Sequence, residues 1–347
     1  MKVTIGILTY NSDATIEFAL ESISKQTALH SVESVLIIDN GSTDNTLSKV
    51  QSPKWANLPI QVFRSGCNNL AYARNQILSH CKTELLLFLD SDGVLSSSWI
   101  ERAILLLTDD MSCRSHQVAG VSGPSHFEAI DKKWVYYALK TMSHSFLGNF
   151  GSVQALLKTE TREVDHLPCT ASLWKADLLR QSKGFDLDFA DAGEDLELGS
   201  RLRFLSHKLI FSEDLEHRHL LEDQSLVAWV KRVFKFGRAQ VFVFSKWPIY
   251  FPLYKIILPH LYLLALISAF ILLSKAVFWG SLLSIIYFQI LFLQCLKYQS
   301  DLRHAFKGTV LMALTHFAYA VGQFSAWPTV LLRLAKNQKR PRFVSEK

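Results

Sequence analysis

Two aspartates one residue apart, Asp90 and Asp92, are the clearest candidates for chemistry in this chain of 347 residues. They follow an apolar run, Leu85–Leu89, and precede Gly93. Two carboxylates held this close repel each other unless a cation compensates them. Mg²⁺ and Mn²⁺ accept oxygen ligands of this kind and usually share them with a substrate phosphate. The pair therefore predicts a divalent-metal site. The alternative is an acidic turn, because Asp-Gly is a common turn signal.

Polar residues also follow the first two apolar runs of the chain. These residues, each directly after such a run, are Thr9, Tyr10, Asn11 and Asp39. Short apolar runs stopped by polar residues are typical of buried strands in a parallel sheet, and ligands bind beyond the carboxyl ends of such strands. We therefore expect these side chains to meet Asp90 and Asp92 at one edge of a sheet. For Asp39 taken alone, a local Asx-turn is an equally good interpretation.

The order of the elements indicates the fold class. Strand-like runs alternate with helical patterns in the order β-α-β-α-β-α-β, with strands expected at 3–8, 35–38, 60–63 and 85–89. This order is typical of an α/β, Rossmann-like doubly wound sheet that binds a nucleotide. A helix expected over 68–80 would carry Arg74, which could pair with a phosphate or a base.

Four segments in the first hundred residues together resemble a known family. VTIGILTYN, VLIIDNGSTDNT, NNLAYARN and LLLFLDSDG are similar to motifs of the GT-A glycosyltransferases of family 2, and the resemblance extends over about Val3 to Asp214. It implies a nucleotide-sugar donor (a UDP-, GDP- or dTDP-sugar) and Mg²⁺ or Mn²⁺ held by Asp90 and Asp92. By position it also implies a donor site formed by Thr9, Tyr10, Asn11, Asp39, Asn69, Arg74, Asp90 and Ser91.

A second acidic motif, Glu194-Asp195, opens a predicted helix further along the chain. Acids in the first turn are favoured by the helix dipole, so simple helix-start chemistry is the alternative interpretation. The stretch resembles the Glu-Asp motif of the same family, which implies that Asp195 is the general base and that Glu194 lies on the acceptor side. Trp174 is assigned to the acceptor side by the same resemblance, although the family's glycine-rich spacing before it is absent.

The basic and histidine residues after this motif have less specific interpretations. Arg201 and Arg203 could brace the helix or meet phosphate, and a solvated basic face explains them equally well. His217 and His219 could reach the metal, but an ordinary surface or core histidine is the better interpretation of each. With the base opposite the leaving group, the expected reaction is a single in-line displacement that inverts the anomeric centre.

Composition changes near Gln224. From Ser225 to Ser300 there is no aspartate or glutamate, and the net charge of the whole chain is +6. Cations interleaved with aromatics over 223–255 suit an anionic bilayer surface, whereas the apolar stretches that follow argue against nucleic acid. Stretches 256–273 and 276–296 are long enough to span a membrane, and 308–332 suits an interfacial or re-entrant helix. The alternative is a hydrophobic domain core.

These observations predict four regions. They are a catalytic domain over 1–222, an amphipathic segment over 223–255, membrane helices over 256–332 and a basic cytoplasmic tail over 333–347. Five cysteines without paired spacing suit a reducing cytosol. We therefore expect an enzyme of the inner or another plasma membrane, with its catalytic domain in the cytoplasm and a lipid-linked or other glycan acceptor used in cell-surface glycan synthesis.

Two alternatives to a glycosyltransferase remain open at this point. A sugar-nucleotide nucleotidyltransferase would also use a doubly wound sheet and a metal, but it would need a glycine-rich phosphate loop where this chain has Thr9-Tyr10-Asn11-Ser12. A non-catalytic membrane scaffold derived from the same fold is disfavoured because Asp90, Asp92 and Asp195 are all present.

Overall fold

The protein is described from a computed structural model. The structure describes residues 1–108, 118–129, 134–145, 147–148, 160–221, 225–271, 276–299 and 301–335, with the side chains of 265–284 excepted. The chain divides into two compact units. The sheet unit comprises the described residues of 1–128 and 159–222, and the helical unit comprises those of 129–158 and 223–339.

Four parallel strands form the first half of the main sheet. They lie in the order β3-β2-β1-β4, with bounds β1 Val3–Thr9, β2 Val32–Asp39, β3 Ile60–Arg64 and β4 Leu85–Asp90. β1 lies between β2 and β4, and these three strands are buried almost throughout. Burial on both faces is why the runs are continuously apolar rather than alternating.

The second half makes the sheet mixed rather than uniformly parallel. Its strands are β9 Ala171–Lys175, β6 Val118–Ser122, β10 Lys208–Phe211 and β8 Arg162–Glu163. β9 runs antiparallel to both β4 and β6, while β10 runs parallel to β6. A smaller sheet joins β5 Gly93–Leu95, β11 His217–Leu221 and β7 Ser125–Ala129. The α/β class predicted from the sequence is confirmed, and the mixed second half is an addition to it.

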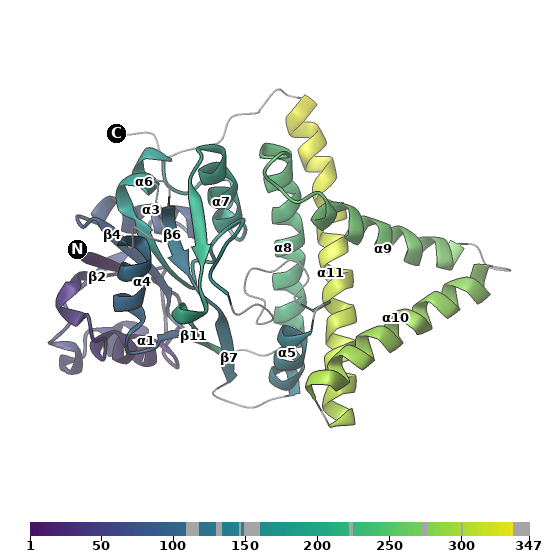
Figure 1. Ribbon diagram of the computed structural model, residues 1–347, viewed down its shortest axis with the longest axis horizontal. Coiled ribbons are helices and arrows are strands. Elements are labelled where there is room, and N and C mark those ends of the chain that lie inside the picture. The colour runs from purple at the N-terminus through teal and green to yellow at the C-terminus, as the bar shows by residue number, and fades with distance from the viewer. Residues whose placement is uncertain are drawn as a thin grey trace. The chain divides into compact units, whose positions relative to one another are not determined.

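Helices cover both faces of the main sheet (Figure 1). Residues of α1 Ile16–Ser24 and α4 Trp99–Thr108 share one core with β1, β2 and β4. On the opposite face, Ile77 of α3 Leu70–His80 lies where a side chain on Gly6 of β1 would be. The remaining helices and turns of this unit are α2 Thr46–Val50, α6 Ala176–Gln181, α7 Glu194–Phe204, and the 3₁₀ turns Leu29–Ser31, Pro53–Trp55 and Glu213–Leu215.

The helical unit is organised around two long helices. Its elements are α5 Trp134–His144, α8 Leu226–Lys246, α9 Tyr254–Ile271, α10 Ala276–Tyr298 and α11 Leu302–Ala335. α8 and α11 lie side by side (Figure 1). Two glycines allow their backbones to touch, because a Cβ on Gly237 would lie 2.2 Å from the Tyr319 carbonyl oxygen and one on Gly322 would lie 2.3 Å from that of Phe234. The sequence analysis did not predict that α5 would belong to this unit.

Polar side chains connect α9 and α10 to α11. The Trp327 indole N–H donates to His260 at 2.7 Å, and Tyr287 and His316 form a 2.5 Å hydrogen bond. Within the part of the chain that the structure describes, no helix combines the length and apolarity that crossing a bilayer requires. The spans expected over 256–273 and 276–296 are therefore unsupported. Residues 272–275, between the two expected spans, and the tail from residue 336 onward lie outside the described residues.

Candidate active site

The loop after β1 leaves one buried hydroxyl without a protein partner. Thr9 is 2% exposed, and its Oγ1 atom has no hydrogen-bond partner among the described residues. Tyr10 is 59% exposed. Asn11 adopts a left-handed backbone conformation, and its side-chain oxygen accepts from the Thr43 N–H at 2.8 Å. Thr9 and Tyr10 thus keep polar groups available at the sheet edge, whereas Asn11 orders the neighbouring loop.

Asp39 ends β2 and forms the Asx-turn that was one of its two interpretations. Its carboxylate accepts from the backbone N–H groups of Gly41 and Ser42, at 3.2 Å in each case, and the residue is only 1% exposed. The same turn carries Ser42, whose hydroxyl accepts from the Asn11 N–H at 2.9 Å. Asp39 therefore fixes the shape of the loop beside the β1 end. A base-reading role remains a prediction.

The two aspartates after β4 lie beside an imidazole. Asp92 Oδ2 is 3.0 Å from His219 Nε2, and the Ser91 hydroxyl is 2.9 Å from that of Ser12. Partial burial and the adjacent Asp92 charge raise the pKa of Asp90 to about 6, against the opposing effects of Arg74 and His219. Asp90 is thus in a region of excess negative charge.

His219, which the sequence analysis interpreted as an ordinary surface or core histidine, lies beside Asp92 and within β11, paired in register with Gly93. The Leu220 N–H also donates to the Asp92 carbonyl at 2.8 Å, which holds β11 against the aspartate turn. His217, two residues before His219, is buried and contacts the Thr170 hydroxyl at 3.2 Å. The alternation in His-Arg-His was the available signal, but the three-residue β5 was too short to predict.

Arg74 joins the end of β4 to the start of α7. Its guanidinium forms an ion pair with Glu194 and lies 3.9 Å from Asp90 Oδ1. The side chains of Arg74 and Glu194 are 8% and 6% exposed. The charges of Asp90, Glu194 and Asp195 all act on this one guanidinium and raise its pKa, against the effect of its burial. Carboxylates from distant parts of the sequence therefore converge around Arg74, as the sheet topology predicts.

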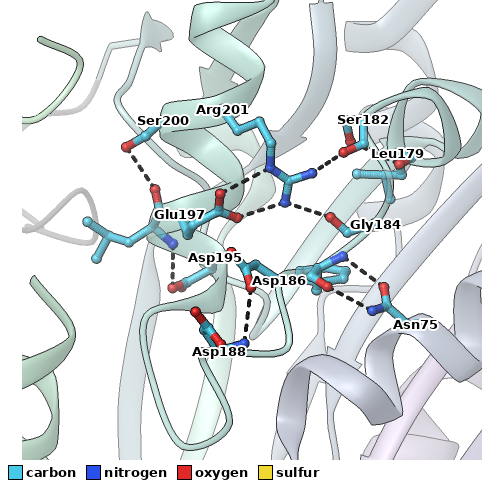
Figure 2. A network of polar contacts seen from close by, with 12 residues as sticks. Asn75, Leu179, Ser182, Gly184, Asp186, Asp188, Asp195, Glu197, Ser200 and Arg201 are labelled. Carbon is cyan, nitrogen blue, oxygen red and sulfur yellow. Dashed lines mark hydrogen bonds and ion pairs between the residues drawn. The ribbon is translucent and has the colours of Figure 1, made fainter. Parts of the chain in front are cut away.

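Asp195 is held in a form suited to proton transfer near neutral pH. Burial and the neighbouring Glu194 charge raise its pKa to about 7, although Arg74 and two backbone N–H groups act in the opposite direction. Its carboxylate accepts from the Leu196 N–H at 2.7 Å (Figure 2). A carboxylate with a pKa near the working pH is an effective general base.

The loop before α7 is fixed by a network of buried polar contacts (Figure 2). Arg201 pairs with Glu197 at 2.7 Å and also donates to the carbonyls of Ser182 and Gly184. Asn75 both donates to and accepts from the Phe185 backbone, at 2.8 and 2.7 Å. Arg201 therefore braces the helix, which was one of its predicted interpretations, whereas Arg203 is partly buried and pairs with Asp165 at 3.0 Å.

Two residues assigned to the acceptor side need correction. Trp174 is fully buried in β9, where its indole N–H donates to the Ser172 hydroxyl at 2.7 Å, so it presents no surface to an acceptor. Glu194 is 5% exposed and paired with Arg74. Asn69 is also occupied by the protein, because it caps α3 through the Tyr72 N–H and donates to the Leu187 carbonyl.

The donor groups at the end of β4 fit a divalent cation that shares its ligands with a substrate. Asp90 and Asp92 supply carboxylate oxygens, and His219 supplies a nitrogen close to Asp92. Oxygen donors with excess negative charge are what Mg²⁺ and Mn²⁺ select. Among the residues that the structure describes, no group of three or more histidine, cysteine or acidic side chains is arranged so that it could hold a metal ion. Phosphate oxygens or water would have to complete the coordination.

Comparison with known proteins identifies the first half of the chain. Residues 4–155 match the model of glycosyl transferase family 2. The uncharacterized glycosyltransferase YfnE of Bacillus subtilis is 34% identical over 105 residues, which are 30% of this chain and 26% of that protein. The validoxylamine A glucosyltransferase of Streptomyces hygroscopicus subsp. limoneus is 28% identical over 229 residues, which are 58% of this chain and 47% of that one. Each match thus spans less than half the length of these curated relatives.

A solved structure resembles nearly the whole fold. The mannosyltransferase PcManGT from Pyrobaculum calidifontis, in complex with GDP-Man and Mn²⁺, superposes with a TM-score of 0.60 at 18% sequence identity. The match covers 93% of this chain and 87% of that one. At this identity the likeness establishes the fold alone. Residues 4–155 thus match glycosyl transferase family 2, and the fold of the chain resembles that of a solved mannosyltransferase.

Proposed function

We propose that the protein transfers a sugar from a nucleoside diphosphate sugar to a hydroxyl of a membrane-associated acceptor, with inversion at the anomeric carbon. The observation that carries this proposal is the convergence of Asp90 and Asp195 on Arg74 at the carboxyl edge of the sheet. A metal motif and a base with a raised pKa are then close enough to act on one substrate. The family match over residues 4–155 and the GDP-Man complex of a structural neighbour support a nucleotide-sugar donor.

The residues divide the reaction between them. Asp195 accepts the proton of the acceptor hydroxyl while that oxygen forms a bond to the anomeric carbon. The bond from this carbon to the diphosphate oxygen breaks on the opposite face, and the nucleoside diphosphate leaves with the bonding electrons. Asp90 and Asp92 would hold Mg²⁺ or Mn²⁺, and such a cation would neutralise charge on the leaving diphosphate. Thr9 and Tyr10 lie at the same edge as candidates to contact the nucleotide.

The acceptor's location is inferred from the surface of the helical unit. Large apolar side chains are exposed on α9 and α10, namely Ile257, Leu258, Leu261, Leu264, Ile285, Ile286, Phe288, Ile290 and Leu293. We call these residues the apolar surface of α9 and α10. Helix α8 of the same unit exposes Lys231, Arg232 and Lys235, and no acid occurs from Ser225 to Ser300. Exposed apolar side chains and exposed cations on one helical unit suit an anionic lipid surface, which supports a lipid-linked glycan or another membrane-borne acceptor.

A donor screen tests this proposal. Purified full-length protein in detergent is incubated with UDP-, GDP- and dTDP-sugars, with and without Mn²⁺, and release of nucleoside diphosphate is measured. We expect one nucleotide class to be turned over with Mn²⁺ and not with EDTA, and the Asp195→Asn variant to be inactive on it. NMR of the glycosylated product should show the inverted anomer. Retention of configuration, or equal turnover by Asp195→Asn, would contradict the proposed mechanism.

A further inference from the structure

The Arg74 guanidinium is already paired with carboxylates of the protein, whereas a side chain that binds substrate keeps its polar atoms available. Its side chain is 8% exposed, is paired with Glu194 and lies within 3.9 Å of Asp90. The guanidinium also stands 5.8 Å from the ring centroid of Phe185. A donor phosphate that took the place of Glu194 on Arg74 would leave a buried carboxylate without its counterion, which is strongly destabilising.

Glu194 is the first residue of the helix that carries the proposed base. The preceding Gly193 has φ +85°, and the N-terminus of α7 has no side-chain cap hydrogen bond. Attachment of Glu194 to Arg74 therefore ties this uncapped helix start to α3. Asp195 follows directly in the chain, so its position depends on that tie.

We propose that Arg74 and Glu194 act together as positioning residues, which fix the start of α7 and orient Asp195, and that Arg74 is not a ligand of the donor. This inference rests on the proposed role of Asp195 but not on the identity of the sugar. It assigns Arg74 a different role from the donor contact that the family resemblance implied.

The charges around Asp195 make the proposal testable. Glu194 on α7 raises the pKa of Asp195, and Arg74 on α3 lowers it. Cys169, before β9, also faces this group, and its buried thiol has a raised pKa. Asp90, at the end of β4, completes the set through its contact with Arg74. Neutralising Glu194 should therefore lower the pKa of Asp195, and neutralising Arg74 should raise it.

The same helix supplies a matched control. Glu197 lies one turn after Glu194 and forms an equally buried ion pair with Arg201. That pair is tied to the carbonyls of Ser182 and Gly184 rather than to α3. Glu197→Gln should therefore lower the melting temperature as Glu194→Gln does, while leaving the titration of Asp195 where it is.

The first arm of the experiment measures nucleotide binding. Calorimetry with UDP, GDP and dTDP in the presence of Mn²⁺ compares the full-length wild type with Arg74→Met/Glu194→Gln, in which neither charge of the pair remains. We expect the dissociation constant of the nucleotide that binds to change by less than about threefold. A loss of about tenfold or more, which is 1.4 kcal/mol, with an unchanged melting temperature would make Arg74 a donor ligand and overturn the proposal.

The second arm follows the titration of Asp195 without requiring turnover. The melting temperature of each variant is compared with that of its Asp195→Asn counterpart from pH 5 to 9. Because the pKa of Asp195 is raised in the folded state, its contribution to stability is lost as pH rises, and the difference levels off above about pH 7. We expect the levelling-off point to move to lower pH in Glu194→Gln and to higher pH in Arg74→Met.

The test remains possible if one variant fails to fold. If Arg74→Met does not fold, both measurements are made on Glu194→Gln and on the doubly neutral variant. An unmoved titration in Glu194→Gln, or an equal shift in Glu197→Gln, would overturn the positioning role. Since neither arm measures sugar transfer, failure of this inference is distinguishable from failure of the proposed function.

Discussion

The edge of the sheet and the apolar surface of α9 and α10 depart from the ordinary distribution of residues in opposite directions. At the sheet edge, charged side chains such as Arg74 and Glu194 are buried. On α9 and α10, leucines such as Leu261 and Leu293 are exposed. Each arrangement is unfavourable for an isolated folded chain in water, because buried charges need partners and exposed apolar area is not removed from solvent.

The two departures differ in how they are compensated. The buried charges compensate one another inside the protein, through Arg74 with Glu194 and Arg201 with Glu197. The apolar side chains named on α9 and α10 have no such compensation among the described residues, and α8 of the same unit also exposes cations. We infer that the sheet edge is preorganised for chemistry, whereas the helical surface is organised for a partner outside the chain.

The largest expected effect tests the sheet edge. Asp92→Asn removes one carboxylate of the metal motif, so turnover should fall by about 10³-fold, because metal stabilisation of the leaving group amounts to several kcal/mol. Mn²⁺-dependent nucleotide binding, measured by calorimetry, should weaken in parallel. Asp177→Asn, at an exposed ion pair on α6, is the control and should behave as wild type. Normal turnover of the wild type in EDTA would contradict the metal assignment.

The next effect concerns pH. The proposed base, Asp195, must be deprotonated to act, and its pKa is raised to about 7, so turnover should fall about tenfold for each unit below pH 7. A bound cation opposes protonation of Asp90, so the loss of turnover at low pH is expected to report the protonation of Asp195. Rates measured from pH 5 to 9 with saturating Mn²⁺ check it. A flat profile down to pH 5 would mean that the base lies elsewhere.

The third prediction concerns the apolar surface of α9 and α10, where substitutions should affect membrane binding more than catalysis. Leu258→Gln/Leu261→Gln should weaken flotation of the full-length protein with phosphatidylglycerol-containing vesicles by at least about tenfold, since each buried leucine contributes about 2 kcal/mol. Nucleotide binding should not change. The control is Leu105→Gln, at a leucine of α4 that is 60% exposed. Equal binding of all three proteins would show that this surface does not meet lipid.

The sequence predicted most where a short run of residues carries both the element and the chemistry. Leu85–Leu89 followed by Asp90 and Asp92 indicated a buried strand and its functional end, and β4 confirms the strand. The start of α7 at Glu194 was likewise indicated by its acids. These features are local, so periodicity and composition suffice to find them.

What could not be predicted depends on contacts between distant segments. His219 reaches Asp92 because β11 pairs with β5, whose three residues give no periodic signal. Trp174 is buried because β9 is inserted antiparallel between β4 and β6, which no local pattern specifies. The sequence places acids in the first turn of α7, but only the structure shows that Glu194 is occupied by Arg74.

The role of Asp195 is the central claim, and one paired measurement tests it most directly. Turnover and nucleotide affinity are determined for wild type and Asp195→Asn on the same donor with Mn²⁺. We expect turnover to fall by roughly 10²-fold or more while the dissociation constant of the nucleotide stays nearly unchanged, as removal of a general base requires. Loss of nucleotide binding with only a proportional loss of turnover would instead place Asp195 in the donor site and contradict the account.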